Sequence, residues 1–250
     1  MSNDPIHQFV IAPIQPIEIG GIDASFTTAS LFMVAGAGIA AWFMTAAMKP
    51  AALVPGRMQT AAESAYGFIQ GMVRDSTGEE GVRKFFPFVF TLFLFIFAAN
   101  MLGMFPYFFT PTSQLVVTAT MALMVFFTVI VVGFAKNGLK FFKLFAPSGV
   151  PGYILPFVIL IEVISFFSRP LSHSIRLWAN ILAGHLVLKV FAGFIPAMAA
   201  VGTLGVVGAI LPLGMTVGLY ALEFLVAFLQ AYVFALLTCL YLNDALHPGH

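Results

Sequence analysis

The chain has 250 residues, of which 60% are hydrophobic and only 8% are charged. A soluble domain carries roughly 25% charged residues, so we expect a polytopic membrane protein that forms a single membrane domain over residues 1–250. The net charge is +1 and the sequence has no basic patch, so nothing in it points to nucleic-acid binding. The single cysteine, Cys239, excludes an intrachain disulfide and a cysteine-based metal site.

The N-terminal arm, residues 1–25, holds no lysine or arginine and no continuous apolar core. We therefore expect neither a cleavable signal nor a transit peptide there. The apolar run 26–47 is long enough to cross the roughly 30 Å hydrocarbon core of a bilayer. It is the first predicted span, and it ends before Lys49 and Pro50.

Residues 57–80 have a different pattern. Apolar side chains recur in steps of three and four residues, and polar or charged side chains lie elsewhere on the helical wheel. This pattern predicts an amphipathic helix that lies on the membrane surface or docks a partner. A short core helix within a loop domain is the alternative.

Two further apolar runs, 86–105 and 115–135, predict the second and third spans, which the short uncharged loop 106–114 connects. Lysine and arginine gather between the first two spans and after the third: Lys49, Arg57, Arg74, Arg83, Lys84, Lys136, Lys140 and Lys143. The positive-inside rule places both basic segments in the cytoplasm. It also predicts an N-terminus outside and a C-terminal tail inside.

The last two apolar stretches, about 152–194 and 201–243, are each much longer than one span. More than forty helical residues extend about 60 Å, twice the thickness of the hydrocarbon core. Breaks at Pro170 and Pro212 would give four spans. The final stretch, however, has no lysine or arginine to mark a loop, which favours two long tilted helices in an antiparallel hairpin. We thus expect an all-α fold with five membrane-embedded helices and one surface helix.

Polar residues are concentrated within residues 162–189 of this apolar half. Arg176 is charged at every accessible pH, and an ionised side chain at the bilayer centre costs about 2.5–3.5 kcal/mol. On a helix, Ser172, Arg176 and Asn180 form one polar stripe, because they are four residues apart. His185 points to the opposite face, so we infer two distinct polar environments.

Folding the last stretch back as a straight antiparallel helix predicts three polar layers. From outside to inside they are His185 with Glu223, Arg176 with Gln230, and Glu162 with Asp244. A His–Glu pair suits proton entry, because such groups can be brought to titrate near physiological pH. A permanent cation at mid-depth repels a migrating proton and attracts a carboxylate from a partner protein. The layers therefore predict two offset half-channels that a moving acidic group connects.

Structural roles remain open for the same side chains. Arg176 could form an ion pair with Glu223 or Glu162, and His185 could hydrogen-bond a backbone carbonyl. We expect structural roles for other polar residues too: packing for His173, an interhelical hydrogen bond for Asn100, interfacial anchoring for Arg169 and snorkelling for Lys189. The sequence contains no phosphate loop, catalytic triad or metal-ligand cluster. We thus expect no cofactor, no metal and no hydrolysis by this chain alone.

The run RLWAN at 176–180, followed by AGH at 183–185, resembles the subunit a family of rotary F-type ATP synthases. The segment NMLGMFPY at 100–107 resembles that family's Asn-Leu-Leu-Gly-x-x-Pro-Tyr segment. The resemblance extends over about residues 26–243. Other positions that fit it are Glu162, the SRPLS run at 168–172, Glu223 and Gln230.

The resemblance implies that Arg176 faces a rotating c-ring and separates the two half-channels. It assigns the remaining site residues as follows: His185 and Glu223 to the outer entry path, Glu162 to the inner exit path, and Gln230, Asn180 and Ser172 to supporting positions. Expected partners are the c-ring of small acidic hairpins, b-type peripheral-stalk subunits near residues 57–80 and the lipid bilayer of a bacterial inner membrane. The only expected substrate is H⁺.

A stand-alone proton-coupled transporter, with Arg176 binding an anionic substrate, is the alternative function. Such transporters usually have internal repeats and broken helices, and the sequence shows no convincing repeat. A purely structural scaffold would leave the placed polar residues unexplained.

Overall fold

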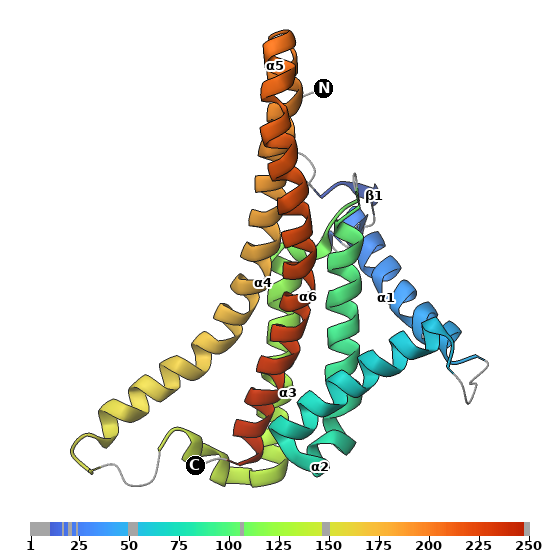
Figure 1. The fold of residues 1–250 in the computed structure, drawn as a ribbon. Coiled ribbons are helices and arrows are strands. Elements are labelled where there is room, and N and C mark those ends of the chain that lie inside the picture. Colours follow the sequence, from blue (N-terminus) through green and yellow to red (C-terminus); the bar gives the residue numbers. More distant parts are fainter. Residues whose placement is uncertain are drawn as a thin grey trace. The chain divides into compact units, whose positions relative to one another are not determined.

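The structure is a computed structural model that describes residues 11–16, 18–19, 22–23, 25–49, 55–105, 108–146 and 151–247 (Figure 1). The start of the predicted arm, the helix-ending Pro50, part of the 106–114 loop and the last three residues lie outside the described residues.

The described chain is built almost entirely of helices. The α-helices are α1 (Thr28–Ala47), α2 (Arg57–Gly103), α3 (Leu115–Asn137), α4 (Leu155–Ala199), α5 (Thr203–Gly208) and α6 (Ile210–Leu246). Two short 3-10 helices, η2 (Pro111–Ser113) and η3 (Gly138–Leu144), flank α3. Within the described residues, five helical segments are long and apolar enough to cross a membrane, with α5 and α6 forming one of them. The predicted all-α polytopic fold class is confirmed.

Short strands precede α1, where the sequence analysis predicted only an arm. The antiparallel pairs are β1 (Pro13–Gln15) with β4 (Phe26–Thr27), and β2 (Glu18–Ile19) with β3 (Ile22–Asp23). Helix α1 starts directly after β4 because Thr27 caps it. The Oγ1 atom of Thr27 accepts a hydrogen bond from the backbone N–H of Ser30 at 3.3 Å, which satisfies a donor that the first helical turn leaves free.

Helix α2 joins two segments that the sequence analysis treated as separate, the amphipathic helix 57–80 and the span 86–105. The backbone leaves helical geometry at Gly78, where φ is 71°. Glycine accepts this left-handed conformation readily because it has no Cβ. Residues 81–85, between the two predicted segments, are helical, and the break in helical geometry lies at Gly78. Before the break, α2 buries a regular face made of Ala62, Ile69, Met72 and Val73.

The first of the two long C-terminal stretches forms one helix, α4, and the second forms α5 and α6, which only Ala209 separates. Helix α4 runs through Pro170 and Pro196 without a break, and Pro212 lies in the first turn of α6, where proline is tolerated. The turn between α4 and α5 contains Gly202, whose φ is 106°. The structure thus favours two long helices over the alternative of four short spans.

The chain folds into two compact units. The first comprises the described parts of Met1–Ile39, Phe95–Gln114 and Leu177–Ala231, and the second comprises those of Ala40–Leu94, Leu115–Arg176 and Tyr232–His250.

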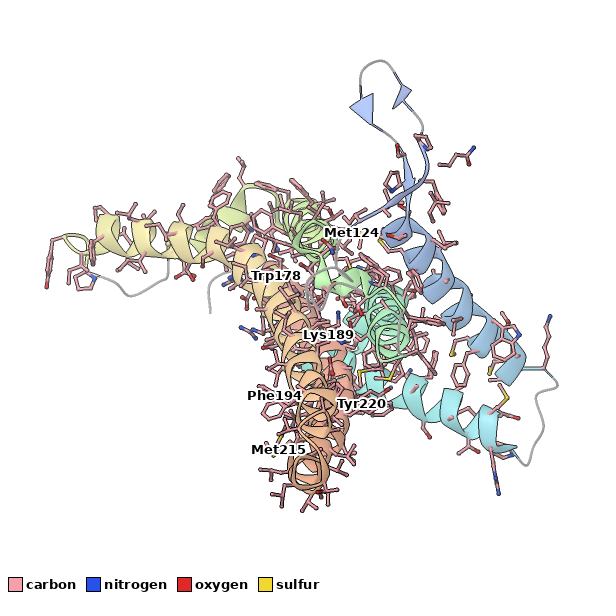
Figure 2. The ribbon with its side chains drawn as sticks, turned by 90° about the horizontal axis from the view of Figure 1, so that it is seen from above. Met124, Trp178, Lys189, Phe194, Met215 and Tyr220 are labelled. Atoms are coloured by element: carbon pink, nitrogen blue, oxygen red, sulfur yellow. The ribbon has the colours of Figure 1, made fainter. Side chains whose placement is uncertain are left out.

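In the first unit, the end of α4 runs antiparallel to α5 and the start of α6 (Figure 1). Phe194 of α4 and Met215 of α6 lie on the outer surface of this hairpin, at 50% and 45% exposure (Figure 2). In the second unit, aromatic rings pack α3 and η3 against α4: Phe126, Phe134, Phe141, Phe145 and Phe166. The described part of each unit therefore buries its core through contacts between helices.

Candidate functional site

The first unit brings His185 of α4 and Glu223 of α6 together. The Nδ1 atom of His185 lies 2.9 Å from the Oε1 atom of Glu223, and the two side chains are 12% and 4% exposed. Gly184 makes this approach possible, because a Cβ atom at that position would lie only 3.1 Å from Oε1 of Glu223. The residues of the predicted outer layer are therefore neighbours in a buried site.

The carboxylate of Glu223 is in an unusual state for a buried group. Both of its oxygens are buried, and neither has a hydrogen bond of good geometry among the described residues. An ionised carboxylate with no compensation is very costly in an apolar interior, so the neighbouring imidazole of His185 is its main source of compensation. A buried, closely coupled acid and base of this kind can share and exchange one proton.

Thr110, which is not among the predicted site residues, completes this site. Its Oγ1 atom lies 3.1 Å from Nε2 of His185, and the residue is 2% exposed. The imidazole thus has Glu223 at one nitrogen and Thr110 at the other. A signal was present in the sequence, because three hydroxyl residues, Thr110, Thr112 and Ser113, occur within four positions of an otherwise apolar loop.

Asn100 fixes the helix that presents Glu223. Its Nδ2 atom donates to the carbonyl of Ala227 at 3.0 Å, one helical turn after Glu223, and its Oδ1 atom accepts from Thr112 at 2.6 Å. This is the interhelical role predicted for Asn100. A second bond ties α6 to the residue that follows α2, since the Tyr220 hydroxyl donates to the carbonyl of Met104 at 2.6 Å (Figure 2 labels Tyr220).

The polar stripe of α4 is exposed. Ser172, Arg176 and Asn180 are each exposed in this chain, whereas His173, Leu177 and Ile181 form a separate, buried face of the same helix. Among the described residues of the second unit, Arg176 and Glu162 form no ion pair, and Glu223 has His185 as its ion-pair partner. Arg176 is therefore an exposed cation that forms no ion pair with the described residues of its own unit.

The predicted innermost layer needs a correction. Asp244 of α6 forms an ion pair with Arg169 of α4 at 2.8 Å. The predicted layer placed Asp244 level with Glu162, which lies seven residues, about two turns, before Arg169 on α4. Phe166 and Tyr241 frame the Arg169 guanidinium, with ring centroids 5.6 and 5.2 Å away. The prediction assumed straight helices and ignored that Arg169 offers Asp244 an opposite charge. Arg169 is thus a partner in an ion pair between helices.

Three other residues singled out in the sequence are buried at least in part. Glu162 is half-buried on α4, and Gln230 is half-buried on α6. Gln230 belongs to the first unit and Arg176 to the second, so their predicted pairing stays a prediction. The ring of His173 packs against that of Phe234, with 3.7 Å between the ring centroids. His173 also lines a small cavity together with Arg169 and Tyr241.

Charged side chains gather beside the Gly78 break of the second unit. Glu80 accepts a hydrogen bond from Lys84 at 2.8 Å and lies 3.8 Å from Lys136 of α3. The hydrogen bond from Lys84, followed by the charge of Lys136, holds the pKa of Glu80 below its usual value. These residues belong to the basic segments that predict the cytoplasmic side.

The site residues come from α2, α4, α6 and the loop before η2. Within the described residues no three His, Cys, Asp or Glu groups are arranged to hold a metal ion. What the arrangement offers is a buried acid–base pair, a hydroxyl partner for it and a separate, exposed cation. Such groups can exchange a proton and attract an anion.

Comparison with known proteins gives a consistent result over the whole chain. A family model described as ATP synthase A chain matches residues 28–243. The proteins named ATP synthase subunit a from Rhizobium johnstonii and Agrobacterium fabrum are each 62% identical to this chain, over 249 and 250 residues. That of Chelativorans sp. is 61% identical over 250 residues. All of this chain and 99–100% of each relative are covered.

These similarities confirm the resemblance seen in the RLWAN and NMLGMFPY segments and give no support to a stand-alone transporter. They also agree with a multi-pass bacterial membrane protein, and the described residues hold five helical segments long and apolar enough to cross a membrane. The chain belongs to the ATP synthase A chain family.

Proposed function

We propose that the chain is the proton-conducting stator subunit of the membrane sector of an F-type ATP synthase. Two offset half-channels protonate and deprotonate a rotating c-ring, and proton flow is thereby coupled to ATP synthesis. The observation that carries the proposal is a buried acid–base pair, His185 with Glu223, in a chain whose helix α4 also carries an exposed cation, Arg176. The pair can pass a proton, whereas the cation cannot.

The proposed path has an entry and an exit. Protons enter from outside through His185 and Glu223 and neutralise a carboxylate on the ring. After the ring turns, they leave past Glu162. The remaining polar residues support the interface with the ring: Gln230, Asn180 and Ser172.

Arg176 separates the two half-channels in this proposal. A guanidinium keeps its charge at every accessible pH, so it repels a proton that would cross directly from entry to exit. It also attracts an ionised ring carboxylate once that group has lost its proton. The exposure of Arg176, Ser172 and Asn180 supports a partner on this face of α4.

The proposal includes an orientation and further partners. The distribution of lysine and arginine supports an N-terminus outside and a C-terminus in the cytoplasm. One membrane domain would then cross with segments 26–47, 86–105 and 115–135 and with the two long helices. Residues 57–80 would lie on the cytoplasmic surface, close to b-type subunits of the peripheral stalk.

The decisive test is Arg176→Ala in the assembled complex, reconstituted into liposomes. We expect coupled ATP synthesis to be lost although the complex assembles. Arg83→Ala is the matched control, because it removes an arginine outside the proposed path and should leave synthesis unchanged. ATP-driven proton pumping at the normal rate in the Arg176→Ala complex would refute the role of this residue.

A further inference from the structure

The imidazole of His185 is held from both sides. Its Nδ1 atom faces Glu223 at 2.9 Å, and its Nε2 atom faces Oγ1 of Thr110 at 3.1 Å. Lys189, one helical turn further along α4, is a half-buried basic residue in the same unit (Figure 2 labels it). Of the three groups named here, only Thr110 is both uncharged and able to donate as well as accept.

A hydroxyl group suits this place for a chemical reason. When His185 is neutral with its proton on Nδ1, Nε2 is an acceptor and the Thr110 hydroxyl can donate to it. When His185 is an imidazolium, Nε2–H is a donor and the same oxygen can accept. A rotation of the hydroxyl hydrogen therefore maintains the contact in both states. A carboxylate or an ammonium group could serve only one of them.

The position of Thr110 is itself fixed. Its carbonyl accepts a hydrogen bond from the Ser113 hydroxyl at 2.7 Å, which closes the turn around η2. Its side chain lies directly against the backbone of Gly103, and a Cβ atom at Gly103 would collide with the Thr110 hydroxyl. Gly103 belongs to the NMLGMFPY segment. A glycine is needed at this position because any side chain would collide with Thr110.

The same loop is tied to the helix that presents Glu223. Thr112 donates to Asn100, and Asn100 donates to the carbonyl of Ala227, one turn after Glu223. Thr110, Thr112 and Asn100 are 2%, 0% and 1% exposed. Both partners of His185 are therefore anchored to one buried hydrogen-bonded scaffold.

We propose that Thr110 is a positioning residue that keeps His185 directed at Glu223 in both protonation states, and that Gly103 provides the space for it. The inference rests on the proposed function of the His185–Glu223 pair as the proton entry. Thr110 acts through His185 and need not bind the proton itself.

The test measures the rate of ATP-driven proton pumping by the assembled complex in liposomes. Thr110→Val preserves the shape of the side chain and removes the hydroxyl. We expect it to lower the rate roughly tenfold, the ratio that loss of one hydrogen bond to a charged group allows. Thr110→Ser retains the hydroxyl and should restore most of the rate. Thr118→Val is the control, because that buried threonine donates to the carbonyl of Leu115 in its own helix.

A double-mutant cycle separates this inference from the proposed function. In a His185→Gln background, Thr110→Val should have little further effect, because the residue through which it acts is gone. Full activity of Thr110→Val, or a loss in Thr110→Ser equal to that in Thr110→Val, would overturn the role of Thr110. Full activity of His185→Gln alone would instead overturn the proposed entry path.

Gly103→Ala is a second variant, in which residue 110 keeps its hydroxyl group. We expect it to lower the pumping rate, because the added methyl group displaces Thr110. Gly36→Ala is its control, since a Cβ atom there meets only ordinary contacts at 3.6 Å or more. Unchanged pumping by Gly103→Ala would contradict the proposal that Gly103 provides the space for Thr110.

Discussion

The Nδ1 atom of His185 lies 2.9 Å from Oε1 of Glu223, across the two long helices of the C-terminal hairpin. Both side chains are almost fully enclosed, so the pair is shielded from solvent within the chain. A proton that reaches one of them can pass to the other without leaving the protein.

Replacement of Glu223 by glutamine should slow proton entry while the complex still assembles. The amide has the same shape but cannot take up a proton, and loss of a proton-transfer group lowers a rate on the order of 100-fold. Proton pumping in liposomes measures the effect. Glu79→Gln is the control, because Glu79 is an exposed acid paired with Arg74. Normal flux through the Glu223→Gln complex would remove this residue from the path.

Gly184→Ala should disturb the pair without destabilising the helix. Its new Cβ atom would lie 3.1 Å from Oε1 of Glu223, so the carboxylate has to shift by a few tenths of an ångström. Alanine is favoured over glycine in a helix by about 1 kcal/mol, so assembly should be preserved. We expect a several-fold loss of proton flux. Gly193→Ala, on the same helix with no atom within 4 Å, should have no effect; equal behaviour of the two variants would contradict the packing argument.

The ion pair between Arg169 and Asp244 should stabilise the second unit. The pair is partly exposed, with Asp244 at 40% and Arg169 at 19%, so solvent screening limits its contribution to about 1 kcal/mol. Arg169→Gln and Asp244→Asn should each lower the thermal denaturation midpoint of the detergent-solubilised protein. The double variant should lose less than the sum of the two. Strictly additive losses would show that the two side chains do not interact.

Gly78→Ala should destabilise the break in α2. Its φ of 71° is unfavourable for a residue with a side chain, at a cost of about 1–2 kcal/mol. No atom lies within 4 Å of the added methyl group, so the cost comes from the backbone alone. Gly67→Ala, in the regular part of α2 and equally free of contacts, should raise the midpoint of thermal unfolding. A rise in both variants would mean that Gly78 does not require its left-handed conformation.

Much of the fold follows from composition and length. A chain that is 60% hydrophobic must bury apolar helices in lipid. Of the two long apolar stretches, the first is the single helix α4, and the second is α6 together with the short helix α5 before it. Hydropathy could not locate the break in α2, because the break depends on the φ angle of one glycine among 22. The short strands before α1 were missed for a similar reason, since they form through local backbone pairing.

The site was predictable only in part. Placing residues at equal depth in a hairpin brought His185 to Glu223, which lie closer to the turn than Arg169 and Asp244 do. Errors in register accumulate with distance from the turn. Further from the turn the same rule failed, and Asp244 pairs with Arg169. Thr110 could not be found by helical periodicity, because it lies in a loop that only the tertiary fold brings to His185.

The most direct test of the whole account is the structure of the assembled complex, with the distance measured from the Arg176 guanidinium to the carboxylate of the nearest ring subunit. The account predicts that Arg176, Asn180 and Ser172 face the ring and that the guanidinium lies nearest to an ionised ring carboxylate. A guanidinium that faces lipid or bulk water, or that is paired with an acidic residue of its own chain and turned away from the ring, would contradict it.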